Sequence, residues 1–142
     1  MSDDWIELQG HPIDAAASVA FVTDARAGGI ATFLGTTRAE RGDDDRELIA
    51  LDYDAYAQMA QKQLHDLADE ARRRWPIVKL ALLHRIGRVK LGEASVAVAV
   101  SCPHRAQAFE ACRWLIDSLK STAAIWKKEI WDDGSATWVH PS

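Results

Sequence analysis

One stretch of the chain, residues 103–131, constrains the fold most, because it predicts an amphipathic helix followed at once by a short apolar strand. Apolar residues recur there at steps of three or four and predict a single buried stripe: Phe109, Cys112, Ile116 and Leu119. His104 and Arg105 stand at the predicted helix start, and Lys120 stands at its end. A helix start offers free backbone N–H groups and a positive dipole end, so His104 and Arg105 would suit an anion there.

The remaining chain predicts an alternation of strands and two further helices. Alternating or continuous apolar runs predict strands at residues 5–8, 29–38, 48–56, 77–86, 94–101, 125–131 and 136–139. One helix is predicted from an Asp14 N-cap to a stop at Gly28 and Gly29. Another is expected to bury one face: Met59, Ala60, Leu64, Leu67, Ala68 and Ala71. This order predicts a single α+β domain over residues 1–142, with a mixed or antiparallel sheet and three main helices.

Charge and cysteine content narrow the classes of protein that fit the chain. A net charge of −4 argues against binding nucleic acid, because phosphate neutralisation needs a basic surface. The five histidines and two cysteines show no metal-ligand spacing, so no metal is expected. The two cysteines make no disulfide framework, which favours a reducing, cytoplasmic setting. An acidic N-terminus and the absence of a long apolar run give no signal for secretion or for a membrane.

Several cationic side chains are candidates for an anion site. Lys127 and Lys128 lie on the predicted strand 125–131, and because successive side chains of a strand point to opposite faces, only one can join Lys120. The spacing alone leaves that choice open. Arg38 is expected at the end of a buried strand, followed by a charged loop at residues 39–47 that we expect to be solvated and mobile.

Two other sets of side chains have alternative interpretations. Cys102 directly precedes the helix start, where a thiolate would be stabilised beside His104 and Arg105, so a cysteine nucleophile is one hypothesis. Against it, small buried cysteines are common, and Cys112 lies on the apolar stripe. A second His-Arg pair occurs at residues 84–85 on a predicted strand, where a structural role is favoured.

Five segments in order carry a resemblance to a known family: GGIATFLGTTR, LDYDAYAQMA, LLHRIGRVKLGE, VAVSCPHRAQAFEACRWLIDSLK and IWKKEIWDDGSATWV. Together they span nearly all of the chain, which on them resembles the MoaE family, the large catalytic subunit of molybdopterin synthase. The resemblance implies an α/β hammerhead-type domain that forms a homodimer and binds a small MoaD-like sulfur-carrier subunit at each end, giving a heterotetramer. It also implies two sulfur transfers, from the carrier's C-terminal thiocarboxylate to cyclic pyranopterin monophosphate, with no metal or organic cofactor.

The same resemblance implies a set of site residues. The catalytic residues would be Lys120 and Lys127, which favours Lys127 over Lys128 as the partner of Lys120. The substrate-binding residues would be Phe33, Arg38, His104, Arg105, Lys128 and Glu129. Two other functions stay open at this point: a sulfurtransferase that depends on Cys102, and a protein that binds an anion or a carrier without catalysis.

Overall fold

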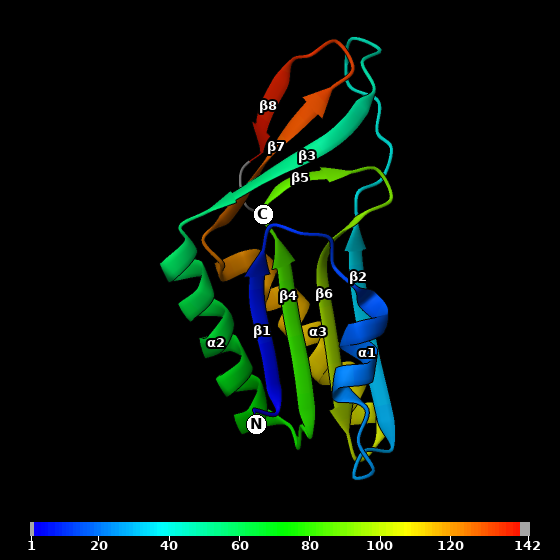
Figure 1. The fold of residues 1–142 in the computed structure, drawn as a ribbon, viewed down its shortest axis with the longest axis vertical. Coiled ribbons are helices and arrows are strands. Elements are labelled where there is room, and N and C mark those ends of the chain that lie inside the picture. Colours follow the sequence, from blue (N-terminus) through cyan, green and yellow to red (C-terminus); the bar gives the residue numbers. More distant parts are fainter. Residues whose placement is uncertain (1, 140–142) are drawn as a thin grey trace.

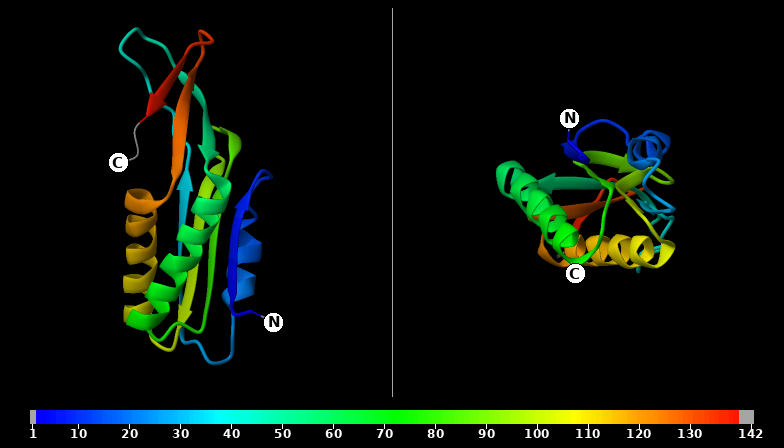
Figure 2. Two further views of the ribbon diagram at one scale, coloured as in Figure 1. Left: turned by 90° about the vertical axis from the view of Figure 1, so that its left-hand side faces the viewer. Right: turned by 90° about the horizontal axis from the view of Figure 1, so that it is seen from below.

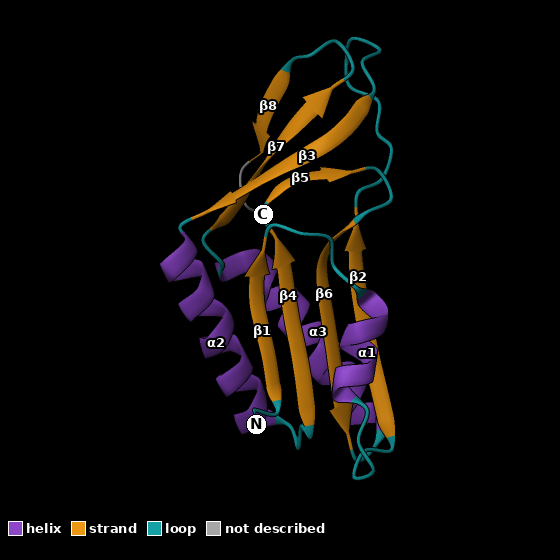
Figure 3. Ribbon diagram, in the orientation of Figure 1, coloured by secondary structure: helices purple, strands orange, loops and turns teal. Residues whose placement is uncertain are grey.

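The computed structural model describes residues 2–139, which form eight strands and three helices (Figures 1 and 3). The strands are β1 (Asp4–Gln9), β2 (Gly29–Thr36), β3 (Leu48–Ala55), β4 (Lys79–Arg85), β5 (Gly87–Lys90), β6 (Ala94–Cys102), β7 (Ile125–Trp131) and β8 (Ala136–Val139). The helices are α1 (Ala15–Val22), α2 (Ala57–Arg74) and α3 (Arg105–Thr122). The predicted α+β class with three main helices is confirmed. No helix in this part of the chain is long and apolar enough to span a membrane.

The first sheet has the strand order β1-β4-β6-β2, in which β1 is parallel to β4 and the other pairs are antiparallel. Helices α2 and α3 cover one face of this sheet, and the short helix α1 lies on the other (Figures 1 and 2). Strand β6 lies inside the sheet and is buried along nearly its whole length, which explains its continuous apolar sequence.

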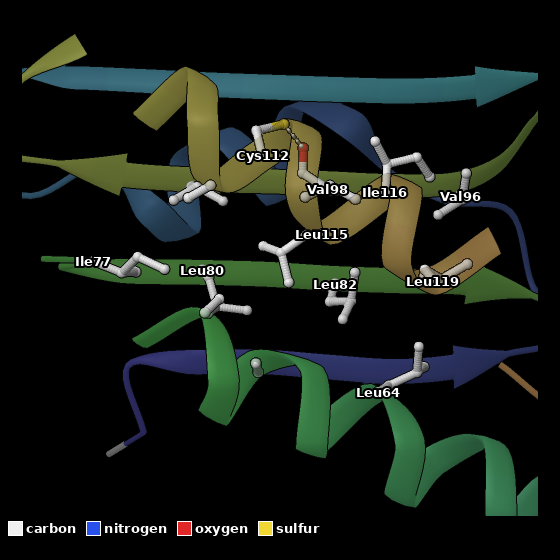
Figure 4. Close-up of a cluster of buried hydrophobic side chains, with 14 of the residues drawn as sticks. Leu64, Ile77, Leu80, Leu82, Val96, Val98, Cys112, Leu115, Ile116 and Leu119 are labelled. Carbon is white, nitrogen blue, oxygen red and sulfur yellow. Dashed lines mark hydrogen bonds between the residues drawn. The ribbon is translucent and has the colours of Figure 1, made fainter. Parts of the chain in front are cut away.

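The core lies between the first sheet and helices α2 and α3 (Figure 4). Its fully buried residues include Leu64, Leu82 and Leu115, and burying each such side chain stabilises the fold by roughly 1.5–3 kcal/mol. The prediction that Phe109 and Met59 are buried is wrong, because Phe109 is 65% exposed and Met59 is 55% exposed. Both lie at the margin of a stripe whose centre is formed by other residues, in α3 by Ala108, Ala111, Cys112, Leu115, Ile116 and Leu119.

The second sheet is antiparallel, has the order β5-β3-β7-β8, and stands at the far end of the first sheet (Figure 1). Strand β5 was not predicted, because its four residues contain a single buried side chain, Val89. A tight turn joins β7 and β8, as the short interval between the two predicted strands requires. Gly134 adopts a φ of 84° there, and its N–H donates to the Trp131 carbonyl at 3.0 Å.

Helix α1 is shorter than predicted, although its Asp14 N-cap is confirmed by a hydrogen bond from the Ala17 N–H at 3.0 Å. It ends at Val22, and Gly28 and Gly29 serve a different purpose. A Cβ added to Gly29 would lie 2.9 Å from the Arg105 Cα, and one on Gly28 would clash with the Pro103 carbonyl. The two glycines therefore let the start of β2 pack directly against the start of α3.

Strand β2 was expected to be buried, and this expectation is wrong. It pairs only with β6 and forms one edge of the first sheet, so its outer backbone groups have no strand partner among the described residues. Three of its apolar side chains are exposed: Ile30, Phe33 and Leu34. A long edge strand with exposed apolar side chains is typical of a surface that pairs with another chain.

Arg72 near the end of α2 is expected to contribute strongly to stability. Its half-buried guanidinium donates to Asp4 at 2.6 and 2.9 Å and to the Ile77 carbonyl at 3.1 Å, which ties α2 to β1 and to the approach to β4. We expect Arg72→Ala to lower the free energy of unfolding by about 2–3 kcal/mol, because several charge-assisted hydrogen bonds are lost together. Urea denaturation followed by circular dichroism measures this change.

The matched control is Arg73→Ala on the next position of the same helix. Arg73 is exposed, and its partner among residues 2–139 is Glu70 on its own helix, so its loss is expected to cost about 0.5 kcal/mol or less. Equal losses from the two variants would contradict the stabilising hydrogen bonds assigned to Arg72.

Candidate active site

Two adjoining cavities lie where the second sheet meets the end of α3. The inner cavity, of about 150 Å³, is lined by Tyr53, His84, Ser95, Val96, Leu119, Lys120, Ile125, Trp126, Lys127 and Val139. The outer cavity, of about 260 Å³, is lined by Gly35, Thr36, Thr37, Arg38, Glu40, Leu48, Leu51, Tyr53, Ser95, Lys120, Lys127 and Glu129. Both share Lys120 and Lys127, so the two amines stand at the boundary between the cavities.

Different elements place the two lysines. Lys120 lies in the last turn of α3, where a cation is favoured by the helix dipole, and its neighbour Leu119 is buried in the core. Lys127 lies on β7 opposite Tyr53 of β3, on the face of the second sheet that lines both cavities. The structure thus brings together two residues whose roles were inferred from the family resemblance.

Lys128 does not join them. Its side chain points to the other face of the second sheet, where its amine lies 5.0 Å from the centre of the Trp138 ring. There it lines a separate surface depression with Asp52 and Arg88. The expectation that Lys128 belongs to the same pocket is therefore not met, because neighbouring residues of a strand face opposite sides.

The cavities concentrate positive charge in a chain whose net charge is −4. Within residues 2–139, no ion pair involves Lys120 or Lys127. Arg38 contributes a third cation from the segment after β2, and its Nε donates to Glu40 at 3.2 Å. Glu129 lines the outer cavity on the same face as Lys127. Lys120 and Lys127, which have no carboxylate partner among residues 2–139, therefore favour an anionic ligand between the two cavities.

Three polar side chains that the sequence did not single out for the site complete the inner cavity: Tyr53, His84 and Ser95. His84 is 5% exposed, its ring packs edge-on against Tyr53 with centroids 5.2 Å apart, and its Nδ1 lies 2.7 Å from the Arg85 carbonyl oxygen. Burial lowers the pKa of His84 to about 4. The hydrogen bond to the Arg85 carbonyl oxygen opposes this shift, and the charge of Lys120 adds to it. His84 is therefore neutral at physiological pH.

Tyr53 and Ser95 both line the wall that the two cavities share. Burial raises the pKa of Tyr53, and the neighbouring Ser95 hydroxyl opposes that shift. The Ser95 hydroxyl also donates to the Gly35 carbonyl of β2 at 3.2 Å. These contacts fix the wall of the cavities beside the two lysines.

His104 and Arg105 lie far from this place within one chain. They stand at the start of α3, whereas Lys120 stands near its end, and at 1.5 Å per residue the two positions are roughly 23 Å apart. Both are exposed. His104 occupies the N-cap position without a side-chain cap hydrogen bond. The single pocket expected from the resemblance is thus not assembled by one chain.

Phe33 borders the site rather than entering it. Its side chain lines a shallow groove between β2 and α3 together with Phe109 and Ile116. Its ring also lies beside Gly35 of the outer cavity, because a Cβ added to Gly35 would approach the Phe33 Cε2 to 3.4 Å.

The environment of the cysteines disfavours a thiolate nucleophile. Cys102 is completely buried, and burial raises the pKa of its thiol. Burial also raises the pKa of Cys112 to about 11. Both thiols are therefore protonated at neutral pH, whereas the thiolate is the reactive form of cysteine.

The charged loop at residues 39–47 has defined contacts at one side. The Arg46 guanidinium lies over the Trp131 ring at 4.8 Å and donates to the Ser135 hydroxyl at 2.8 Å. The loop is thereby attached to the turn between β7 and β8, next to the outer cavity.

Within the described part of the chain, no group of three or more His, Cys, Asp or Glu side chains is arranged to hold a metal ion.

Comparison with known proteins gives consistent matches to one family. A family model described as MoaE protein matches residues 8–122. The chain is 42% identical to the molybdopterin synthase catalytic subunit of Nostoc sp. over 96% of its length and 82% of that protein. It is 41% identical to the subunit of the same name from Thermoplasma volcanium, over 97% of the chain and 99% of that protein.

Solved structures agree with these matches. The crystal structure of molybdopterin synthase from Staphylococcus aureus superposes with a TM-score of 0.86 at 32% sequence identity. The superposition covers 99% of this chain and 98% of that one. The likeness therefore extends over both sheets and all three helices.

Proposed function

The chain belongs to the MoaE protein family, and we propose that it is the catalytic subunit of a molybdopterin synthase. It transfers sulfur from the C-terminal thiocarboxylate of a small carrier subunit to cyclic pyranopterin monophosphate, and forms the dithiolene of molybdopterin in the cytoplasm. The observation that carries this proposal is the pair Lys120 and Lys127, which line both cavities without a carboxylate partner among residues 2–139.

The charge and size of the two cavities fit the two reactants. The carrier's thiocarboxylate and the cyclic phosphate of the substrate are both anions, so each is stabilised by the ammonium groups of Lys120 and Lys127, which line the cavities. The narrow inner cavity takes the extended end of the carrier, and the wider outer cavity takes the pterin phosphate beside Arg38. The lysines then lie beside the sulfur and the carbon that it attacks.

The two lysines have different roles in this proposal. Lys120, at the end of a rigid helix, transfers a proton as the carbon–sulfur bond forms and the cyclic phosphate opens. Lys127 holds the charge of the anions in place. Water then cleaves the bond between the carrier's acyl carbon and the transferred sulfur, which leaves a carboxylate on the carrier. A second thiocarboxylated carrier supplies the second sulfur in the same way: its sulfur bonds to the neighbouring carbon, the oxygen on that carbon leaves as water, and hydrolysis frees the carrier as a carboxylate.

A homodimer accounts for the distant position of His104 and Arg105. The free edge of β2 carries exposed apolar side chains, and its first residue lies against Arg105 while the segment after its last residue carries Arg38. If two β2 strands pair antiparallel about a two-fold axis, the start of one strand lies next to the end of the other. His104 and Arg105 of one subunit then reach the outer cavity of its partner.

Turnover by the purified chain tests the proposed function. The chain, mixed with a thiocarboxylated carrier and cyclic pyranopterin monophosphate, is expected to form molybdopterin, detected by chromatography of its oxidised fluorescent product. A carrier with an ordinary C-terminal carboxylate is the control and is expected to give no product. The absence of product with a competent carrier would leave a non-catalytic, carrier-binding or anion-binding protein.

The cysteine-dependent alternative is tested by Cys102→Ser. Because the Cys102 thiol is buried and protonated, we expect this variant to keep molybdopterin formation within about 3-fold of the unmodified chain, as for a site away from the chemistry. Mass spectrometry of the chain during turnover is expected to show no persulfide. Loss of activity with an unchanged circular dichroism spectrum would favour the thiol mechanism instead.

A further inference from the structure

The hydrogen-bond requirements of the inner cavity point to a role for His84. An ammonium group carries three N–H donors, and in a cavity from which a ligand has expelled water each donor needs an acceptor. One thiocarboxylate shared by Lys120 and Lys127 cannot accept from every donor of both. Acceptors supplied by the cavity wall are therefore needed when the site is filled.

The position of His84 fixes which of its ring nitrogens is an acceptor. Its Nδ1 lies 2.7 Å from the Arg85 carbonyl oxygen, and because a carbonyl oxygen only accepts, Nδ1 carries the proton. The buried ring is neutral, as its pKa of about 4 indicates, so Nε2 has a lone pair and no hydrogen. Within residues 2–139 no hydrogen bond to Nε2 is present, and His84 lines the inner cavity.

The other polar groups of the cavity wall, Ser95 and Tyr53, do not offer an equivalent acceptor. The Ser95 hydroxyl donates to the Gly35 carbonyl at 3.2 Å, and Tyr53 lines the same wall of the cavity. Hydroxyl groups both donate and accept, so they can turn a proton toward an anion. An imidazole with its Nδ1 proton engaged can only accept at Nε2, which excludes the anion from this wall and favours a cationic donor. Of the two lysines, Lys120 is the one whose charge acts on His84.

We propose that His84 is a positioning residue: its Nε2 accepts a hydrogen bond from the Lys120 ammonium in the filled inner cavity and thereby directs the remaining N–H groups of Lys120 toward the reacting sulfur. This inference rests on the proposed function and adds to it a residue that acts through Lys120. The edge-on packing of Tyr53 against the imidazole, at 5.2 Å between centroids, holds the ring in the required orientation.

Two variants separate the two nitrogens of His84. In His84→Asn the side-chain amide can still donate to the Arg85 carbonyl, but no atom reaches the position of Nε2. In His84→Gln the side-chain oxygen reaches that position and can accept. We expect His84→Asn to lower kcat by about 10- to 100-fold, as for a misplaced catalytic group, with KM for the pterin nearly unchanged. His84→Gln is expected to restore kcat to within about 5-fold of the unmodified chain.

Combining His84→Asn with Lys120→Ala shows whether His84 acts through the lysine. We expect the double variant to be no slower than Lys120→Ala alone, because residues that act as a unit are not additive. Equal kcat values for His84→Asn and His84→Gln, additive losses in the double variant, or failure of both single variants to fold would each overturn the inference. If the unmodified chain forms no product, the proposed function fails first, so the two failures are distinguishable.

Discussion

Lys120→Ala is expected to lower kcat for molybdopterin formation by about 10²–10³-fold, the range found when a proton-transfer group or an anion-stabilising donor is removed. Lys120 lines both cavities, where the thiocarboxylate and the pterin phosphate meet, and no carboxylate pairs with it in the described part of the chain. Leu119 anchors the helix end in the core, so the exposed Lys120 can be truncated without loss of the fold. Steady-state kinetics with a saturating carrier measures the change.

The comparison of Lys127→Ala with Lys128→Ala is the matched control for this prediction. Both residues are neighbouring lysines of β7, but only Lys127 lines the cavities, while Lys128 lies over Trp138 on the other face. We expect a loss of about 10-fold or more from Lys127→Ala, from removed anion stabilisation, and at most a few-fold loss from Lys128→Ala. Similar losses from both, or unchanged turnover in Lys120→Ala, would contradict the site.

The choice between Lys127 and Lys128 shows what the residues alone could and could not predict. Strand periodicity states that the two side chains point to opposite faces. It does not state which face lines a cavity, because apolar residues flank both positions: Ile125 and Trp131 on one face, Trp126 and Ile130 on the other. The family resemblance favoured Lys127, and the register with Tyr53 places Lys127 on the cavity side.

Strand β2 shows a similar limit at the level of the sheet. Its sequence is apolar on both faces, which is typical of a central strand, and the prediction of burial followed from that. Whether a strand lies at an edge depends on the order of strands, a property of pairings between distant parts of the chain. Its apolar side chains are explained by the homodimer that we propose rather than by the core of one chain.

Phe109 and His84 show two limits of the sequence analysis. The spacing of Phe109 fits the buried stripe of α3, yet it lies at the margin of that stripe beside the open edge of β2 and is exposed. His84 was expected to have a structural role on its strand, and its burial and its contact with the Arg85 carbonyl agree with that role, but the strand pattern did not predict that it also lines the inner cavity. The signal that it borders the site is its position at the end of β4 (Lys79–Arg85), where the first sheet meets the second.

Mixing two inactive variants is expected to restore activity if the partner subunit supplies Arg105. Lys120→Ala and Arg105→Ala are each expected to be nearly inactive as homodimers. In a mixed dimer, one site combines the intact Lys120 of one subunit with the intact Arg105 of the other. If the two co-expressed chains assort at random, half of the dimers are mixed, and each mixed dimer has one intact site out of two. About a quarter of the unmodified activity is therefore expected. If Arg105 acted within its own chain, the mixture would stay inactive.

A second mixture shows that the restored activity requires complementary sites. Lys120→Ala combined with Lys127→Ala places each loss in the cavity of its own subunit, since both lysines line the same cavities within one chain. Every site of that mixed dimer lacks one lysine, and we expect no restoration. Restoration there would indicate that the lysines are exchanged between subunits.

Leu34→Glu, which places a negative charge on the edge of β2, is expected to abolish restoration in the first mixture. The charge at this exposed position would oppose the pairing of the two β2 edges.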